Sequence, residues 1–189
     1  MKPTWHAWRA AAAALLTLLL AHAAANGAAP PAAPPAQGYQ PLAFLVDHCW
    51  KGTFPGGQVT DEHCFSWIYG GKFVRDEHVV PRSGGRPDDF GESIYLFDTA
   101  SGELQYLYIE SAGGFSRGTV TAAPDAHVFP ATTLTEAGHA QTYRSRGQRR
   151  GDDTYEVVTE FQQSDRWVPT LSLQMHRVTR SAPPDVTPR

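Results

Sequence analysis

The sequence predicts an all-β domain of about ten antiparallel strands that closes into an up-and-down barrel. Apolar and polar residues alternate with period two along almost every segment. Turn-forming residues, mostly Gly with Pro, Asp or Ser, recur roughly every 8–12 residues. No segment shows a helical period over a useful length. A sheet of this many strands must protect two edges, and closure removes both, so a barrel is favoured over a sandwich.

The start of the chain predicts export. Lys2 and Arg9 give residues 1–25 a positive beginning, residues 10–20 are apolar, and small residues suited to cleavage follow. The apolar run is shorter than the roughly 20 residues that a membrane-spanning helix needs. We therefore expect a cleaved signal peptide and a soluble, periplasmic or secreted protein with no membrane span after cleavage.

The barrel domain is predicted to lie between two disordered segments. Residues 26–38 form an Ala/Pro-rich linker, and residues 181–189 form a proline-rich tail. Residues 39–180, between them, are enough for one domain with a hydrophobic core. The formal net charge is −3, and no basic patch with interleaved aromatic residues occurs, so no nucleic-acid partner is expected.

The elements follow from the turn signals. The apolar residues 42–46 predict one helical turn that closes an end of the sheet. Residues 48–67 predict a hairpin of two strands around Pro55-Gly56-Gly57. The same criteria place the remaining strands at residues 72–81, 92–98, 104–111, 115–122, 127–132, 141–146, 154–163 and 167–177.

The two cysteines lie on the two strands of this hairpin. A turn centred on its two glycines places Cys49 opposite Cys64, which in an exported chain predicts a disulfide. A zinc site that adds His48 and His63 is the alternative. Neighbouring residues of a strand point to opposite faces, so the four side chains cannot converge, and we predict no metal site.

The same alternation assigns the faces of the hairpin. The cysteine side is expected to face solvent, and the opposite side carries Asp61 and His63 among large aromatic residues. These polar groups are costly to bury without a partner, so they either bond to neighbours or contact water or a ligand. The next strand leaves its faces open, because Arg75 and Glu77 lie on one side and His78 on the other, and either side can be the inner one.

Six residues with an aromatic or amphipathic ring are candidate ligand-binding residues. Some are chosen because they are expected to point inward, and the others because of their size and amphipathic character. They are Trp50, His63, Phe65, Trp67, Tyr95 and Tyr106. Parity within the hairpin supports the first four. The two tyrosines rest on size and amphipathic character alone.

The order Leu42-Ala43-Phe44-Leu45, Cys49-Trp50-Lys51-Gly52 and Trp67-Ile68-Tyr69-Gly70-Gly71 resembles that of lipocalin-like (calycin-type) barrels. It is most similar to exported bacterial members of that group whose function is uncharacterised. The likeness covers residues 39–177. It implies a ten-stranded barrel with an interior pocket.

A more distant resemblance is to nitrobindins, barrels that bind haem through a histidine near the C-terminus. The histidine at the matching place is His176. Leu173 and Met175 belong to the core-facing side of the same predicted strand, so His176 is expected to point outward. The resemblance therefore makes haem only a third option.

The sequence favours binding over catalysis. No residues have the spacing of a nucleophile elbow or a phosphate loop. The leading hypothesis is a non-catalytic barrel that holds a small apolar or amphipathic molecule in an aromatic-lined cavity, with no cofactor. The alternative is a solidly packed, ligand-free barrel that acts as a protein-interaction or envelope module. A homodimer is compatible with both hypotheses.

Overall fold

The computed structural model describes residues 38–82, 84 and 87–180. The predicted signal peptide, the linker before Gly38 and the predicted tail lie outside the described residues. Within the described part of the chain, no helix is long and apolar enough to cross a membrane.

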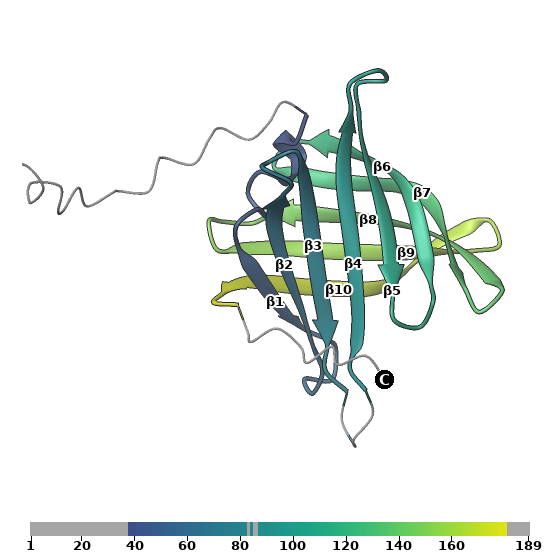
Figure 1. Cartoon of the computed structure of the whole chain (residues 1–189). Helices are drawn as coiled ribbons and strands as arrows, with labels where there is room; N and C mark the ends of the chain where they lie inside the picture. The colour runs from purple at the N-terminus through teal and green to yellow at the C-terminus, as the bar shows by residue number, and fades with distance from the viewer. Residues whose placement is uncertain (1–37, 83, 85–86, 181–189) are drawn as a thin grey trace, which may run out of the picture. The chain divides into compact units, whose positions relative to one another are not determined.

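Ten antiparallel strands form a closed up-and-down barrel, which confirms the predicted fold class (Figure 1). The 3-10 turn η1 (Gln40–Leu42) precedes them. The strands are β1 (Cys49–Thr53), β2 (Thr60–Ile68), β3 (Phe73–Val80), β4 (Asp89–Asp98), β5 (Glu103–Glu110), β6 (Phe115–Ala123), β7 (Ala126–Glu136), β8 (His139–Arg149), β9 (Thr154–Gln163) and β10 (Arg166–Val178). Each strand pairs with its neighbours in sequence, and β1 pairs with β10 to close the barrel. In Figure 1, β3 and β4 run across the direction of β8 and β9.

The strands β7 and β8 are longer than predicted. The prediction ended the first at residue 132 and began the second at residue 141, whereas the hairpin extends to a tight turn at Ala137-Gly138. Both turn residues have positive φ, 47° and 80°, as a two-residue hairpin turn requires. Gly138 is a turn signal, but alanine rarely adopts positive φ, and the prediction left residues 133–140 outside the strands.

The opening hairpin has the predicted register. Cys49 lies opposite Cys64 with a Cα–Cα distance of 4.1 Å, and the two form a disulfide. The cysteine side was expected to face solvent, and it does lie outside the barrel, but each cysteine is only 7% exposed. The carboxylate of Glu62 lies 4.0 Å from the Cys64 sulfur and also binds the Lys51 ammonium at 3.2 Å.

The N-terminal segment closes one end of the barrel. Leu42 and Leu45 are fully buried, and the Trp50 indole N–H donates to the Leu45 carbonyl at 3.2 Å. The Tyr39 hydroxyl donates to the carbonyl of Lys72 at 2.8 Å and accepts the N–H of Phe97 at 3.0 Å. These bonds tie the segment to β1, to the turn before β3 and to β4, so the segment covers this end of the barrel.

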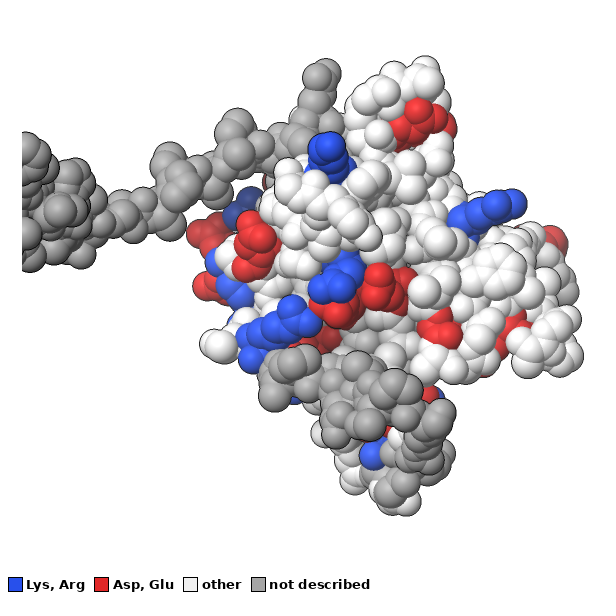
Figure 2. All heavy atoms as spheres, in the orientation of Figure 1, with Lys and Arg blue, Asp and Glu red and all other residues white. Residues whose placement is uncertain are grey.

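The outer surface over β1 to β3 carries paired charges. Figure 2 shows Lys and Arg interspersed with Asp and Glu on the viewed face. Glu77, for example, binds Arg75 at 3.0 Å and Arg180 at 2.7 Å. Exposed pairs of this kind contribute little to stability, about 0–1 kcal/mol each. The ionisable groups inside the barrel are a different case.

Candidate functional site

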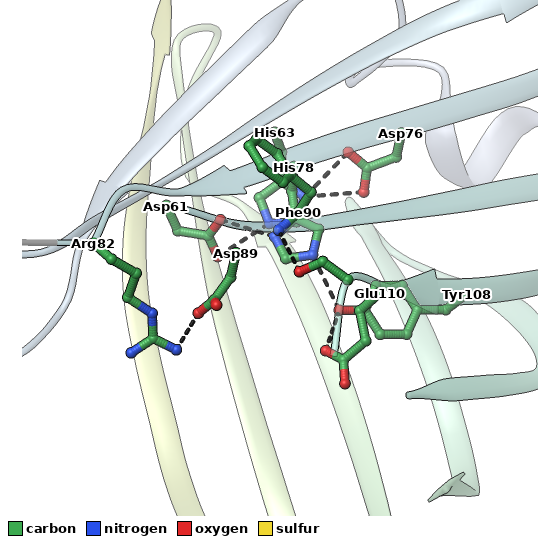
Figure 3. A network of polar contacts seen from close by, with 10 residues as sticks. Asp61, His63, Asp76, His78, Arg82, Asp89, Phe90, Tyr108 and Glu110 are labelled. Carbon is green, nitrogen blue, oxygen red and sulfur yellow. Dashed lines mark hydrogen bonds and ion pairs between the residues drawn. The ribbon is translucent and has the colours of Figure 1, made fainter. Parts of the chain in front are cut away.

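Six polar side chains from three strands meet on the interior face of the barrel, and we call them the interior polar network (Figure 3). The network consists of Asp61 and His63 from β2, Asp76 and His78 from β3, and Tyr108 and Glu110 from β5. The end of the barrel nearest these residues is the one opposite η1, because β2 begins there and β3 and β5 end there.

Strand register brings the network together. His63 lies directly opposite His78 in the β2–β3 pair, and Phe65 lies opposite Asp76. The register of β3 with β4 places His78 opposite Gly91. A Cβ atom on Gly91 would lie 2.0 Å from the His78 Nε2 atom and 2.9 Å from the Tyr108 ring. The missing side chain of Gly91 therefore lets His78 reach across β4 to β5.

His63 lies between two carboxylates. Its Nδ1 atom is 2.9 Å and 3.1 Å from the two oxygens of Asp76, and its Nε2 atom is 3.2 Å from Asp61 Oδ2. Burial alone lowers the pKa of His63, but Asp76 and Asp61 outweigh burial and raise the net pKa well above its usual value. Burial raises the pKa of Asp61, but His63 and His78 outweigh it and hold that pKa below its usual range.

His78 connects the carboxylate of Asp61 to β5. Its Nδ1 atom lies 3.2 Å from Asp61 Oδ1, and its Nε2 atom lies 3.0 Å from the Tyr108 hydroxyl oxygen. That hydroxyl donates to Glu110 at 3.1 Å. The rings of His63 and His78 stack with centroids 4.9 Å apart and an interplanar angle of 12°.

The network is sheltered but not sealed. The side chains of His63 and His78 are 24% and 15% exposed, whereas those of Asp61 and Asp76 are mostly buried. Arg82 and Asp89 form an ion pair beside the network in Figure 3. Both imidazole rings therefore keep contact with solvent in the folded barrel.

The six predicted ligand-binding residues all lie inside the barrel, but in two different settings. Trp50, Phe65, Tyr95 and Tyr106 are buried together in the hydrophobic core cluster. Trp67 packs against that cluster. Among the six, His63 alone belongs to the interior polar network. Ligand binding by these residues stays a prediction.

Tyr106, which was predicted from its size and amphipathic character alone, makes an aromatic contact and a hydroxyl contact inside the barrel. Tyr106 packs edge-on to Phe129 with centroids 5.1 Å apart, and its hydroxyl lies 3.4 Å from that of Tyr143. The Tyr143 hydroxyl also lies 2.9 Å from Ser116 Oγ. Burial raises the pKa of Tyr143, so this hydroxyl stays protonated and able to donate.

Sequence reasoning missed four members of the network. It left the inner face of β3 undecided, and the structure places Asp76 and His78 on it. A usable signal was the Gly70-Gly71 turn, because a short turn there sets His78 opposite His63. Alternation places Tyr108 and Glu110 on the same face as Tyr106, but the contact of Tyr108 with His78 depends on the gap at Gly91, which the sequence does not reveal.

The predicted alternative metal and haem ligands do not converge. The sulfurs of both cysteines are used in the disulfide, so the zinc site with His48 and His63 is not formed. His176 is exposed on the outer side of β10, while its neighbour Met175 is buried in the core. The outward direction predicted for His176 is confirmed.

Compared with models of known protein families and with curated protein sequences, the chain matches none. The class of protein is therefore defined by fold and site. It is a closed ten-stranded antiparallel barrel with aromatic clusters inside and a histidine–carboxylate network near one end.

Proposed function

We propose that this protein is an exported binding barrel that holds a small amphipathic molecule in its interior. The observation that carries the proposal is the interior polar network, whose two carboxylates are buried while its two histidines remain partly exposed. Burying charged groups costs several kcal/mol unless partners compensate, and an apolar interior would stabilise a purely structural barrel at least as well. Contact with the polar group of a ligand would explain why the carboxylates and histidines of the interior polar network lie inside the barrel.

A row of stacked rings leads from the polar network to the aromatic core. The ring of His63 stacks on Phe65 with centroids 6.2 Å apart, and Phe65 stacks on Tyr95 at 6.5 Å. An amphipathic molecule suits this gradient, because its polar group can bond to the histidines while its apolar part contacts the aromatic rings. The resemblance to lipocalin-like barrels is in keeping with this mode of binding.

The ligand-free barrel remains the second candidate, and the closed end of the molecule favours it. Trp50 is fully buried there and packs against Tyr155, with ring centroids 5.0 Å apart. If the whole interior were packed in this way, function would lie on the outer surface. Haem binding has less support, because His176 lies on the outside of the barrel.

The test is native mass spectrometry of protein matured in a periplasm, compared with the same sample after denaturation. We expect a reproducible extra mass that is lost on denaturation and that identifies the molecule. Phe65→Ala should lower the occupancy several-fold, whereas Phe115→Ala, at a residue 47% exposed on the outer face, should leave it unchanged.

A bare chain calls for a second measurement, the thermal stability of the protein with a panel of fatty acids and aromatic carboxylic acids. A bound ligand raises the melting temperature by mass action. Absence of both an adduct and a thermal shift would contradict the proposal and favour the ligand-free barrel.

A further inference from the structure

We propose that Asp61, His63 and His78 form a binding site for one divalent transition-metal ion, with Zn²⁺ as the representative ion. Each residue offers one ligand atom, and the three atoms lie within 4.8 Å of one another. The metal site does not rest on the proposed organic ligand, because all of its ligand atoms come from the barrel itself.

The distances within the site suit a metal ion. Asp61 Oδ2 lies 3.2 Å from His63 Nε2, and Asp61 Oδ1 lies 3.2 Å from His78 Nδ1. Ligand atoms of a tetrahedral zinc site with bonds of about 2.0–2.1 Å are roughly 3.3 Å apart. The rings of His63 and His78 are stacked with an interplanar angle of 12°, so a rotation of the side chains is needed to point both nitrogen lone pairs at one ion beside the carboxylate.

The network is rich in acceptor groups. Five contacts run in series from Asp76 through His63, Asp61, His78 and Tyr108 to Glu110. Three of these six side chains are carboxylates, which only accept hydrogen bonds when they are ionised. The two oxygens of Asp61 each face a nitrogen of one imidazole ring.

The outer contacts of the two rings turn one nitrogen of each towards the proposed site. His63 Nδ1 faces the Asp76 carboxylate, which leaves His63 Nε2 facing Asp61. The Tyr108 hydroxyl donates to Glu110 and can accept from His78 Nε2, which leaves His78 Nδ1 facing Asp61. Both of these nitrogens can bind a metal ion in their unprotonated form.

A divalent cation can take the place between Asp61 and the two rings. One ion at a single point can accept the lone pairs of both nitrogens and bind the carboxylate. Ligand nitrogens must be unprotonated, so binding is expected to release any proton that the two rings hold there.

The outer contacts of both histidines match those of metal ligands. A metal-bound histidine usually donates its other ring N–H to a carboxylate or another fixed acceptor. Asp76 is placed to do this for His63, and Tyr108, held by Glu110, for His78. These contacts fix which nitrogen of each ring faces Asp61.

The ligand set indicates the class of ion. Two imidazoles and one carboxylate suit Zn²⁺, Fe²⁺, Co²⁺, Ni²⁺ or Cu²⁺ rather than Mg²⁺ or Ca²⁺, which prefer oxygen ligands. Three protein ligands leave at least one coordination position open. Because both rings are partly exposed, that position can hold water or the polar group of a ligand.

The experiment is isothermal titration of metal-free protein, without a histidine tag, with Zn²⁺, alongside visible spectroscopy of Co²⁺ binding. We expect one ion per chain. His78→Gln and Asp61→Asn should each weaken binding at least tenfold, and Asp76→Asn should weaken it by about 10–100-fold through His63. His176→Gln is the matched control, because His176 is exposed on the outer face, and its affinity should equal that of the wild type.

A wild-type protein that binds neither ion, or variants that bind as tightly as the wild type, would overturn the proposal. If a variant does not fold, nuclear magnetic resonance of the wild type with Co²⁺ decides. The imidazole signals of His63 and His78 should shift or broaden strongly while that of His176 does not, and the opposite pattern would also overturn it. Zn²⁺ binding is measured without any organic molecule, so its failure is distinguishable from failure of the proposed function.

Discussion

Two histidines inside the same barrel differ in their surroundings. His127, near the η1 end, packs among Phe44, Phe129 and Tyr155, and its Nδ1 atom has no hydrogen-bond partner among the described residues. Burial, with a smaller contribution from the charge of His63, lowers the pKa of His127 to about 4. His63 lies between two carboxylates, which raise its pKa despite burial.

The difference shows that partners, and not burial alone, decide the charge of a group inside this barrel. The strands that face His127 supply aromatic rings, so the neutral imidazole is an apolar filler. The surroundings of His63 are the carboxylates of Asp61 and Asp76 and the imidazole of His78. One end of the barrel is therefore built for packing, and the interior polar network is built for polar contact.

The largest expected effect tests whether packing near η1 carries the stability. Trp50→Ala should lower the free energy of unfolding by about 3–5 kcal/mol, since it removes a fully buried indole. Tyr108→Phe, which removes one hydroxyl from the network, should cost only about 1 kcal/mol. Urea unfolding measures both, and Tyr69→Ala, at a residue 77% exposed, is the control and should change little. Equal losses of unfolding free energy in Trp50→Ala and Tyr108→Phe would contradict the view that the η1 end is built for packing and the interior polar network for polar contact.

The second effect depends on pH. The unfolded chain protonates His127 as the pH falls through about 6.5, while the folded chain does so only near pH 4. The unfolded state thus binds more protons in this window, and the free energy of unfolding falls as the pH is lowered, by about 2–4 kcal/mol in total.

His127→Leu should remove this part of the acid sensitivity. Unfolding free energies of the variant and the wild type, measured from pH 7 to pH 4, should diverge in favour of the variant as the pH falls. His139→Gln, at an exposed histidine of β8, should follow the wild type. Parallel curves for His127→Leu and the wild type would show that His127 is not held neutral.

Local patterns were enough to predict the fold and two of the six residues of the interior polar network. Period-two alternation and turn residues determine an all-β barrel, and a two-glycine turn determines that Cys49 faces Cys64. The same parity placed Asp61 and His63 inside. The disulfide and the inward direction of Asp61 and His63 use neighbours within one hairpin, where a single turn fixes the register.

The rest of the network depends on contacts between separate hairpins. The face of β3 could not be chosen, because both of its faces mix apolar with ionisable residues. His78 contacts Tyr108 across β4 only because Gly91 lacks a side chain. An isolated glycine in a predicted strand does not indicate which side chains will occupy the space beside it. These contacts follow from the closed sheet and not from the local sequence.

The smallest of these comparisons of stability concerns two glycines. Each of them leaves room for one of the interior histidines. A Cβ atom on Gly147 would lie 2.1 Å from His127 Cε1, and one on Gly91 would lie 2.0 Å from His78 Nε2. Each Gly→Ala substitution should lower the free energy of unfolding by about 1–3 kcal/mol. Gly151→Ala, with open space around it, is the control and should change stability by less than about 0.5 kcal/mol.

Double-mutant cycles then separate the two ends. Adding His127→Ala to Gly147→Ala should restore little stability, since removing that ring leaves a cavity among three aromatic rings. Adding His78→Ala to Gly91→Ala should recover most of the loss caused by the glycine substitution, because the partly exposed space can fill with water that bonds to Tyr108 and Asp61. Equal recovery of stability in the two double variants, each compared with its Gly→Ala single variant, would mean that His78, like His127, is a packed core residue, and the contrast between the two ends would not hold.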